Sequence, residues 1–315
     1  QGSDLGKSEA IRHLKKIGIK VFSKHHTKNI KNIDVLVVSA AISGKNPEIK
    51  EANKQKIPII PRAEMLSELM RFKKGVAVAG THGKTTTTSL IATILSEGNL
   101  DPTYVIGGRL NSMNASAKLG DSDLMIVEAD ESDASFLHLN PVSAIITNID
   151  NDHLGTYQNN FEKLKQTYID FAHQVPFYGP IFLCADDKHI RDIMPKISRP
   201  IVTYGLKNKV DIQAVNIRYE GNKVHFKVVD NKYNHNEFDI TINFPGEHFV
   251  RNTLAAIAIA LEYDVSNINI QRALTNFEGV ARRYEIYDNV LIQDKKIKVI
   301  DDYGHHPTEI EAVLK

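Results

Sequence analysis

Over most of the chain, short and continuously apolar runs alternate with longer segments in which apolar residues recur at helical spacing. Continuously apolar runs of about four residues are typical of strands that helices cover on both faces. Strand–helix–strand alternation therefore predicts a parallel sheet with right-handed crossovers. The predicted strands are residues 35–38, 76–79, 124–127 and 144–147, and the predicted helices are residues 63–72, 85–97 and 161–172.

The pattern changes close to residue 205. Three segments beyond this point alternate apolar and polar residues with a period of two, and turn-forming residues separate them. This arrangement predicts an antiparallel meander. Helical spacing of apolar residues then resumes, and two strand-forming residues follow it near the end of the chain. The strands are expected at residues 211–218, 223–229, 237–244 and 299–300, the turns at 221–222 and 230–236, and the helices at 252–263 and 268–277.

Composition excludes several classes of protein. Hydrophobic residues make up 42% and charged residues 24% of the 315 residues, which excludes wholesale disorder and suits about two domains. The net charge of +1 provides no global basic field for a nucleic-acid backbone. No apolar run approaches the roughly 18 residues of a membrane span. We therefore expect neither a nucleic-acid nor a membrane partner, and the lone Cys184 fits a reducing, cytoplasmic compartment.

The strongest chemical signal is a glycine-rich turn between a predicted strand and a predicted helix. Glycines let backbone N–H groups close around phosphate oxygens, and the helix N-terminus adds a favourable dipole. In such a loop, Lys84 would neutralise phosphates and the Thr85 hydroxyl would ligate Mg²⁺. Because Val78 stands where the usual eight-residue pattern has Gly, the alternative is a plain glycine turn beside a solvated lysine. The loop comprises Gly80, Thr81, His82, Gly83, Lys84, Thr85 and Thr86.

Two other predicted strands also end in polar residues. Glu128 is the first carboxylate after the strand at 124–127, and His153 follows the strand at 144–147. Since α/β sheets bind ligands at the carboxyl ends of their strands, Glu128 is a candidate ligand for the hard cation that accompanies phosphates. His153 is a candidate for a second divalent ion or for positioning phosphate. The alternatives are a solvated acidic loop and a structural histidine.

Three later features give weaker signals. Asn252, before a strongly apolar helical pattern, is either an N-cap or a contact to a nucleotide base or ribose. The Arg282–Arg283 doublet is either a surface pair or the source of an arginine that stabilises a transferred phosphoryl group. Residues 301–307 gather two carboxylates, a phenol and two imidazoles. Because neighbouring side chains of an extended segment point to opposite faces, we expect two or three of these groups to face a site.

Taken together, these segments resemble the Mur ligase family of ATP-dependent, amide-forming enzymes of peptidoglycan precursor synthesis. The resemblance covers essentially the whole chain, in order. Within the family, Ser132 favours the member that adds L-alanine over a sister enzyme that recycles a tripeptide and has Tyr there. The matching segments are residues 39–43, 46–48, 62–66, 80–86, 128–136, 147–153 and 301–308.

The resemblance implies an α/β fold in three parts. Residues 1–74 would be a Rossmann-like UDP-sugar-binding domain, and residues 75–282 a P-loop-type ATP-binding central domain with an antiparallel β extension. Residues 283–315 would begin a Rossmann-like C-terminal domain that supplies much of the amino-acid site and closes over ATP. We therefore expect that the first strand–helix unit of the family and most of its third domain are missing from this chain.

The resemblance also implies a reaction. ATP, with Mg²⁺ or Mn²⁺, would activate the lactyl carboxylate of UDP-N-acetylmuramate as an acyl phosphate, which the amine of L-alanine would attack. Two residues, Phe249 and Gly155, depart from the family pattern, which has Asn and Asp there. By resemblance, the catalytic residues are Lys84, Glu128, His153, Arg283 and Asp302; the nucleotide-binding residues are Gly80, Thr81, His82, Gly83, Lys84, Thr85, Thr86, His248, Asn252 and Arg283; the substrate contacts are Ser39, Ser43, Ser132, His305 and His306; and the metal ligands are Thr85, Glu128 and His153.

Three other functions compete with this assignment. The chain could be a nucleotide-binding fragment without turnover, or the tripeptide-recycling ligase that shares the phosphate loop. A generic P-loop kinase is disfavoured by Val78. The sequence makes no prediction of oligomeric state.

Overall fold

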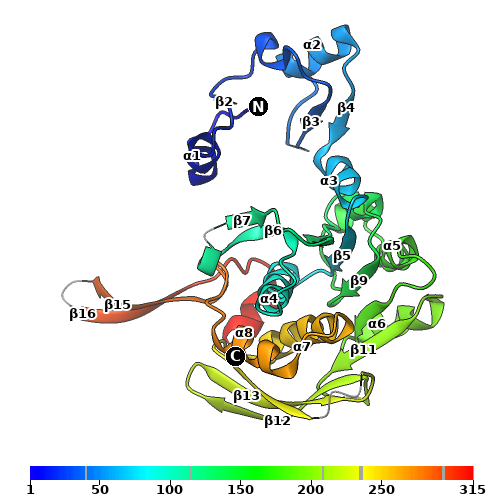
Figure 1. Cartoon of the computed structure of the whole chain (residues 1–315), viewed down its shortest axis with the longest axis vertical. Helices are drawn as coiled ribbons and strands as arrows, with labels where there is room; N and C mark the ends of the chain where they lie inside the picture. The colour runs from blue at the N-terminus through cyan, green and yellow to red at the C-terminus, as the bar shows by residue number, and fades with distance from the viewer. Residues whose placement is uncertain (40, 114, 208, 234–236, 293–294, 315) are drawn as a thin grey trace. The chain divides into compact units, whose positions relative to one another are not determined.

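The chain folds into two compact units, Gln1–Leu69 and Met70–Lys315, in a computed structural model (Figure 1). The structure describes residues 1–39, 41–113, 115–207, 209–233, 237–292 and 295–314. The division falls near the end of helix α3 (Arg62–Met70), a few residues before the expected boundary at residue 74. The assignment of functions to three domains stays a prediction.

The first unit is built around two short pairs of parallel strands. A buried carboxylate on one of its helices links three segments. Glu48 accepts hydrogen bonds from the Ser3 hydroxyl and the Asn29 amide, both at 2.6 Å. Burial alone would raise the pKa of Glu48, but these hydrogen bonds lower it. The elements are β1 (Gly2–Ser3), α1 (Glu9–Lys16), β2 (Val21–Phe22), η1 (Thr27–Ile30), β3 (Leu36–Val38), α2 (Pro47–Gln55), β4 (Ile59–Pro61) and α3.

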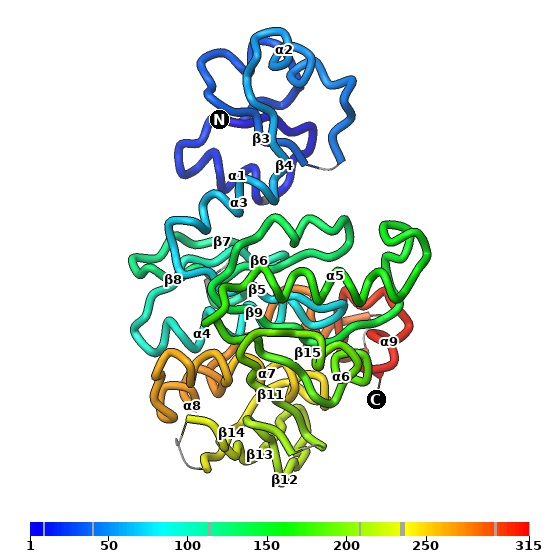
Figure 2. Tube along the Cα trace, turned by 90° about the vertical axis from the view of Figure 1, so that its right-hand side faces the viewer, coloured from blue at the N-terminus to red at the C-terminus, as the bar shows by residue number. Residues whose placement is uncertain are grey.

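A ten-stranded sheet forms the centre of the second unit within the described residues. Its strands run parallel from β6 to β12, while β7 at one edge and β13 and β14 at the other pair antiparallel. Figure 2 shows β12, β13 and β14 at the opposite end of this unit from β6 and β7. In spatial order the strands are β14 (Phe238–Ile242), β13 (Lys223–Asp230), β12 (Ile212–Glu220), β11 (Ile201–Gly205), β10 (Ile181–Cys184), β9 (Ser143–Ile146), β5 (Lys74–Ala79), β8 (Leu124–Glu128), β6 (Thr103–Leu110) and β7 (Ala115–Lys118).

Helices cover both faces of the parallel part, as the continuously apolar runs predicted. Val76, Val127 and Ile146, on β5, β8 and β9, are fully buried. Figure 1 shows α4, α7 and α8 against one face, and α5 and α6 against the other. No helix in the described parts of the chain is both long and apolar enough to cross a membrane. The helices are α4 (Lys84–Glu97), α5 (Phe161–Gln174), α6 (Lys188–Ile193), α7 (Glu247–Glu262) and α8 (Asn267–Thr275), with short 3-10 turns η2 (Asn111–Met113), η3 (Ser135–His138), η4 (Leu154–Tyr157) and η5 (Met194–Lys196).

The predicted parallel sheet and antiparallel meander are confirmed, but one helix boundary was wrong. Helix α7 begins at Glu247, five residues before the predicted start. Gly246 occupies the N-cap position, so Asn252 lies inside the helix and its interpretation as an N-cap is incorrect. In the predicted turn at 230–236, residues 234–236 lie outside the described part of the chain.

Several strands were not predicted. The largest omission is an antiparallel hairpin, β15 (Glu285–Ile292) and β16 (Lys295–Asp301), of which only residues 299–300 were expected to be strand. The side chains of β15 are exposed or half-buried on both faces, so no alternation of apolar and polar residues marks it. Helix α9 (Pro307–Leu314) follows the hairpin. Strands β6, β7, β10 and β11 also went unpredicted.

Candidate active site

The phosphate loop follows β5 at the middle of the sheet, between the carboxyl ends of β9 and β8. Two of its residues have backbone conformations that require glycine. Gly80 has a φ of +128°, and a side chain there would overlap the Thr147 hydroxyl after β9. Gly83 has a φ of +83°, and a Cβ would lie 2.6 Å from the Asn252 Oδ1 atom of α7. The loop is therefore held tightly between β9 and α7.

Lys84 points back across the loop. Its ammonium donates hydrogen bonds to the carbonyl oxygens of Gly80 (2.7 Å) and Thr81 (3.1 Å) and to the Glu131 carboxylate (2.8 and 3.0 Å). Glu131 is only 1% exposed. Burial raises the pKa of Glu131, and the charge of Lys84 opposes that rise. Sequence reasoning missed Glu131 as a site residue, because nothing in the acidic segment distinguishes the carboxylate that turns inward.

Thr85 and Glu128 lie together, as predicted for two ligands of one metal ion. The Thr85 hydroxyl donates to Glu128 Oε2 at 3.2 Å, and the Gly107 N–H donates to Glu128 Oε1 at 2.6 Å. Burial raises the pKa of Glu128, while the Gly107 N–H and Lys84 oppose the rise. A nearby cation would stabilise the charged form of this half-buried carboxylate, so the pair fits a hard, oxygen-liganded ion.

His153 follows β9, the strand next to β5 in the sheet. It precedes η4 with a φ of +53°, and its imidazole is 3.5 Å from the Asp152 carboxylate and 39% exposed. Among the described residues, His153 lines neither the main cavity nor the cluster around His82. Its assignment to a second metal ion therefore still rests on the resemblance alone.

A cavity of about 580 Å³ opens beside the loop. The end of β9, the start of α7 and the segments on either side of the β15–β16 hairpin all contribute to it. Asp186, Asp187 and Lys207, beyond β10 and β11, also line it and were not predicted. Recognising β10 and β11 in the sequence would have identified them, since ligands collect at the carboxyl ends of strands. The predicted residues that line the cavity are His82, Gly83, Thr86, His248, Asn252, Arg283 and Asp302.

One residue of the Arg282–Arg283 doublet and one of the adjacent carboxylates Asp301 and Asp302 line this cavity. Arg283 lines it, whereas the Arg282 side chain is 60% exposed and lies 3.9 Å from the Asp301 carboxylate. Both guanidinium groups lie over the Tyr303 ring. Asp302 also lines the cavity and accepts a hydrogen bond from the N–H group of Tyr284 at 2.8 Å. Asp302 thereby fixes the backbone next to Arg283.

The start of α7 presents an imidazole and a phenyl ring to the cavity. Burial lowers the pKa of His248 to about 4, so this imidazole is neutral at neutral pH. Phe249 packs against Phe244 at 5.2 Å and Tyr284 at 6.1 Å between ring centroids. Where the family pattern has Asn, this chain therefore has part of an aromatic cluster.

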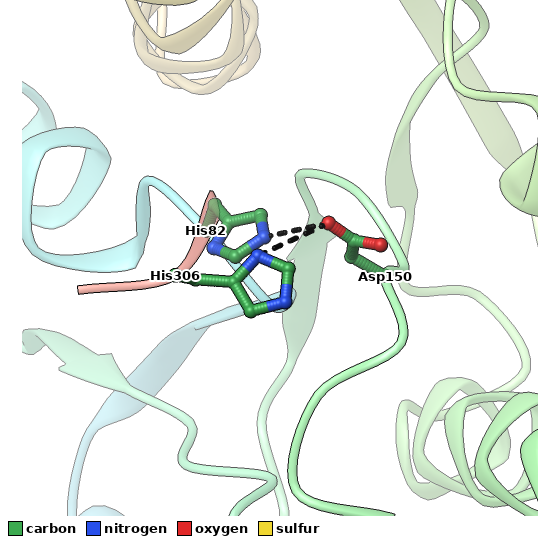
Figure 3. A group of neighbouring side chains, drawn as sticks. All are labelled: His82, Asp150 and His306. Carbon is green, nitrogen blue, oxygen red and sulfur yellow. Dashed lines mark hydrogen bonds and ion pairs between the residues drawn. The ribbon is translucent and has the colours of Figure 1, made fainter. Parts of the chain in front are cut away.

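His82 belongs to a polar cluster with Asp150 and His306 (Figure 3), and His82 and Asp150 also line the cavity. Its Nε2 atom lies 2.9 Å from Asp150 Oδ2, its Nδ1 atom lies 3.2 Å from Glu309 Oε1, and its ring is 5.0 Å from that of His306. Burial lowers the pKa of His82, but the two carboxylates outweigh it and raise the pKa overall. Burial alone would raise the pKa of Asp150, but hydrogen bonds from Thr308 and His82 lower it to about 2.

The remaining predicted substrate contacts are dispersed. His305 is exposed beside Glu309, so His306 and Asp302 are the residues of the 301–307 stretch that turn inward, which agrees with the expected two or three. The Ser132 N–H donates to Asp130 at 2.9 Å. Ser39 and Ser43 are exposed in the first unit, between β3 and α2, where their hydroxyls accept hydrogen bonds from nearby backbone N–H groups.

Comparisons with known proteins agree along the chain. Residues 78–260 match the Mur ligase middle domain, and residues 1–74 match the catalytic domain of the Mur ligase family. A UDP-N-acetylmuramate–L-alanine ligase from Hydrogenovibrio crunogenus is 52% identical over 313 residues, which are 99% of this chain and 68% of that protein.

Two solved structures are similar over 99% of this chain. The UDP-N-acetylmuramate-alanine ligase MurC from Thermotoga maritima has a TM-score of 0.83, 30% identity and 70% of its length covered. A murein peptide ligase from Psychrobacter arcticus has a TM-score of 0.82, 27% identity and 69% of its length covered.

Proposed function

The chain belongs to the Mur ligase family, and from that premise we propose that it joins L-alanine to the lactyl carboxylate of UDP-N-acetylmuramate at the expense of ATP. This reaction is a step of peptidoglycan precursor synthesis. The observation that carries the choice of amino acid is the 52% identity to an L-alanine ligase over nearly the whole chain. The phosphate loop and its cavity support the use of ATP.

In this reaction the γ-phosphoryl group passes to the lactyl carboxylate and gives an acyl phosphate. The amine of L-alanine then attacks the carbonyl carbon, and phosphate leaves. Most of the catalysis is positioning and charge neutralisation, because phosphoryl transfer asks little covalent chemistry of the protein. We assign phosphate binding to Lys84 and the loop N–H groups, stabilisation of the transferred group to Arg283, and nucleotide contacts to His248 and Asn252.

We further propose that Thr85 and Glu128 hold Mg²⁺ or Mn²⁺. Their two oxygens lie 3.2 Å apart, and Glu128 is a half-buried carboxylate whose charged form a cation would favour. When bound, the ion would neutralise charge on the β- and γ-phosphate oxygens. His153 as a ligand of a second ion is proposed on family resemblance.

The domain roles are part of the same proposal. Residues 1–74 bind the UDP-sugar, with Ser39 and Ser43 among the contacts, and residues 75–282 bind ATP. Residues 283–315, with His305 and His306, begin the amino-acid region, and Ser132 contributes to substrate selection. A cytoplasmic location is proposed with them.

A panel of amino acids tests the substrate assignment. Phosphate release would be measured with ATP, Mg²⁺ and UDP-N-acetylmuramate plus L-Ala, L-Ser, Gly or a tripeptide. This chain would be compared with a version extended to the length of its relatives. We expect that whichever of the two versions is active releases phosphate only when L-alanine is present. Release only with tripeptide would favour the recycling ligase, and release that ignores the amino acid would contradict the ligase assignment.

Arg283 and Arg282 provide a matched pair of variants. Arg283→Ala should lower kcat on the order of 10³-fold, because an arginine that contacts the transferred phosphoryl group acts mainly in the transition state. The KM for ATP should change much less. Arg282→Ala is the control, since its side chain is exposed and does not line the cavity. Steady-state kinetics measure both, and equal losses in the two variants would contradict the role given to Arg283.

A further inference from the structure

Three segments far apart in the sequence bring metal-binding atoms to one place (Figure 3). His82 comes from the phosphate loop, Asp150 follows β9, and His306 directly precedes α9. One ligand atom from each of the three lies within 4.8 Å of the other two. The three side chains are half-buried, which leaves the cluster accessible to a small ion from solvent.

The distances suit a tetrahedral ion. Asp150 Oδ2 is 2.9 Å from His82 Nε2 and 3.7 Å from His306 Nδ1. Two ligands of a tetrahedral zinc ion, each about 2.0 Å from the metal, are ~3.3 Å apart. The two separations from Asp150 lie on either side of this value, and the ligand nitrogens of His82 and His306 lie within 4.8 Å of each other, so an ion would draw the three side chains together.

The surrounding groups orient these ligands. Glu309 Oε1 lies 3.2 Å from His82 Nδ1, which leaves Nε2 directed at Asp150. A carboxylate behind a histidine in this way is the usual second contact of a metal-binding imidazole. Asp150 is itself held, because the Thr308 hydroxyl donates to Oδ2 at 2.7 Å and the Asn151 N–H donates to Oδ1 at 2.7 Å.

We propose that His82, Asp150 and His306 bind a divalent transition-metal ion of the Zn²⁺ class, at a site separate from the oxygen ligands Thr85 and Glu128. Two imidazoles and one carboxylate are a donor set for zinc or cobalt rather than magnesium, which prefers oxygen alone. Three protein ligands leave a fourth position for water. On binding, the metal takes the place of the proton between His82 Nε2 and Asp150, which passes to solvent, and of the Thr308 N–H that His306 Nδ1 accepts at 3.3 Å.

The site does not depend on the ligase assignment. Cobalt is a suitable probe, because four-coordinate Co²⁺ absorbs strongly in the visible range, and Zn²⁺ binding can be followed by calorimetry. With the untagged whole chain we expect one equivalent of Co²⁺ to give this absorption and one equivalent of Zn²⁺ to displace it. Excess Mg²⁺ should leave the signal unchanged. Absence of the absorption, or its loss to Mg²⁺, would overturn the proposal.

Adjacent histidines give a matched control. His306→Ala should weaken Zn²⁺ binding at least about tenfold. Glu309→Gln should weaken it roughly 10–100-fold, because Glu309 orients the ligand His82 without contacting the metal. His305→Ala should leave the affinity unchanged, since that imidazole is exposed and lies beside Glu309 Oε2, whereas His82 faces Oε1. If His306→Ala does not fold, Asp150→Asn replaces it as the test. Unchanged affinity in a folded variant of either ligand would rule out the site.

Discussion

Replacing Lys84 with Met should weaken ATP binding roughly 10–100-fold, since a charged hydrogen-bond donor to phosphate is lost, and should slow phosphate release on the order of 10³-fold. The same change should lower the free energy of unfolding by about 3 kcal/mol. It leaves the Glu131 carboxylate buried without its partner, and such losses cost about 3–5 kcal/mol. The lower value applies because the Lys84 side chain is 17% exposed. Calorimetry with ATP and Mg²⁺ and denaturant unfolding measure the two effects.

The double variant Lys84→Met, Glu131→Gln separates these effects. It removes the uncompensated charge, so stability should return while nucleotide binding stays weak. In the single variant the loss of stability should also depend on pH. Burial keeps the pKa of Glu131 above its unfolded value, so the loss should be largest near neutral pH and should disappear below the unfolded pKa of about 4.3. A stable single variant, or a double variant that regains ATP affinity, would contradict the role given to Lys84.

Gly80→Ala should lower the free energy of unfolding by about 2–6 kcal/mol, the sum of backbone strain at its positive φ and overpacking. The new methyl group would overlap the Thr147 hydroxyl and approach the Thr147 N–H, which β5 holds through a backbone hydrogen bond. Neither strand can move without disturbing the central sheet. Nucleotide binding should be lost with the geometry of the loop. Denaturant unfolding gives the stability, and calorimetry gives the ATP affinity.

Gly155→Ala is the control for this variant. A methyl group at Gly155 would have no neighbour within 4 Å, and the φ of this residue is not positive. Its replacement should change stability by no more than about 0.5 kcal/mol. Similar losses from both substitutions would mean that the close approach of β9 to the loop is not what makes Gly80 necessary.

The sequence predicted those parts of the site that local chemistry determines. Apolar runs indicated the central strands, and Thr85 and Glu128 were expected as ligands of the cation that accompanies phosphates, since α/β sheets bind ligands at the carboxyl ends of their strands. The structure places the Thr85 hydroxyl 3.2 Å from Glu128 Oε2. The inward turn of part of the 301–307 stretch followed from the alternation of side chains along an extended segment.

The parts that escaped prediction depend on contacts across long sequence separations. Glu131 is one of several carboxylates in its segment, and only its pairing with Lys84, 47 residues away, distinguishes it. Glu309 and Asp150 become partners of His82 only when α9 packs beside the phosphate loop. Asn252 was ambiguous because Gly246, without a capping side chain, gives little sign of the start of α7.

The strand order also affects how the chain acquires its structure during synthesis. Strand β5 hydrogen-bonds to β8 and β9 rather than to its nearest neighbours in sequence, and β9 ends at Ile146, 67 residues after Ala79. At roughly 5–20 residues per second, a ribosome needs about 3–13 s to make that stretch. Throughout this interval the edge of β5 that pairs with β9 lacks its partner. The nascent chain is then most exposed to aggregation, and a chaperone would protect it most effectively during those seconds.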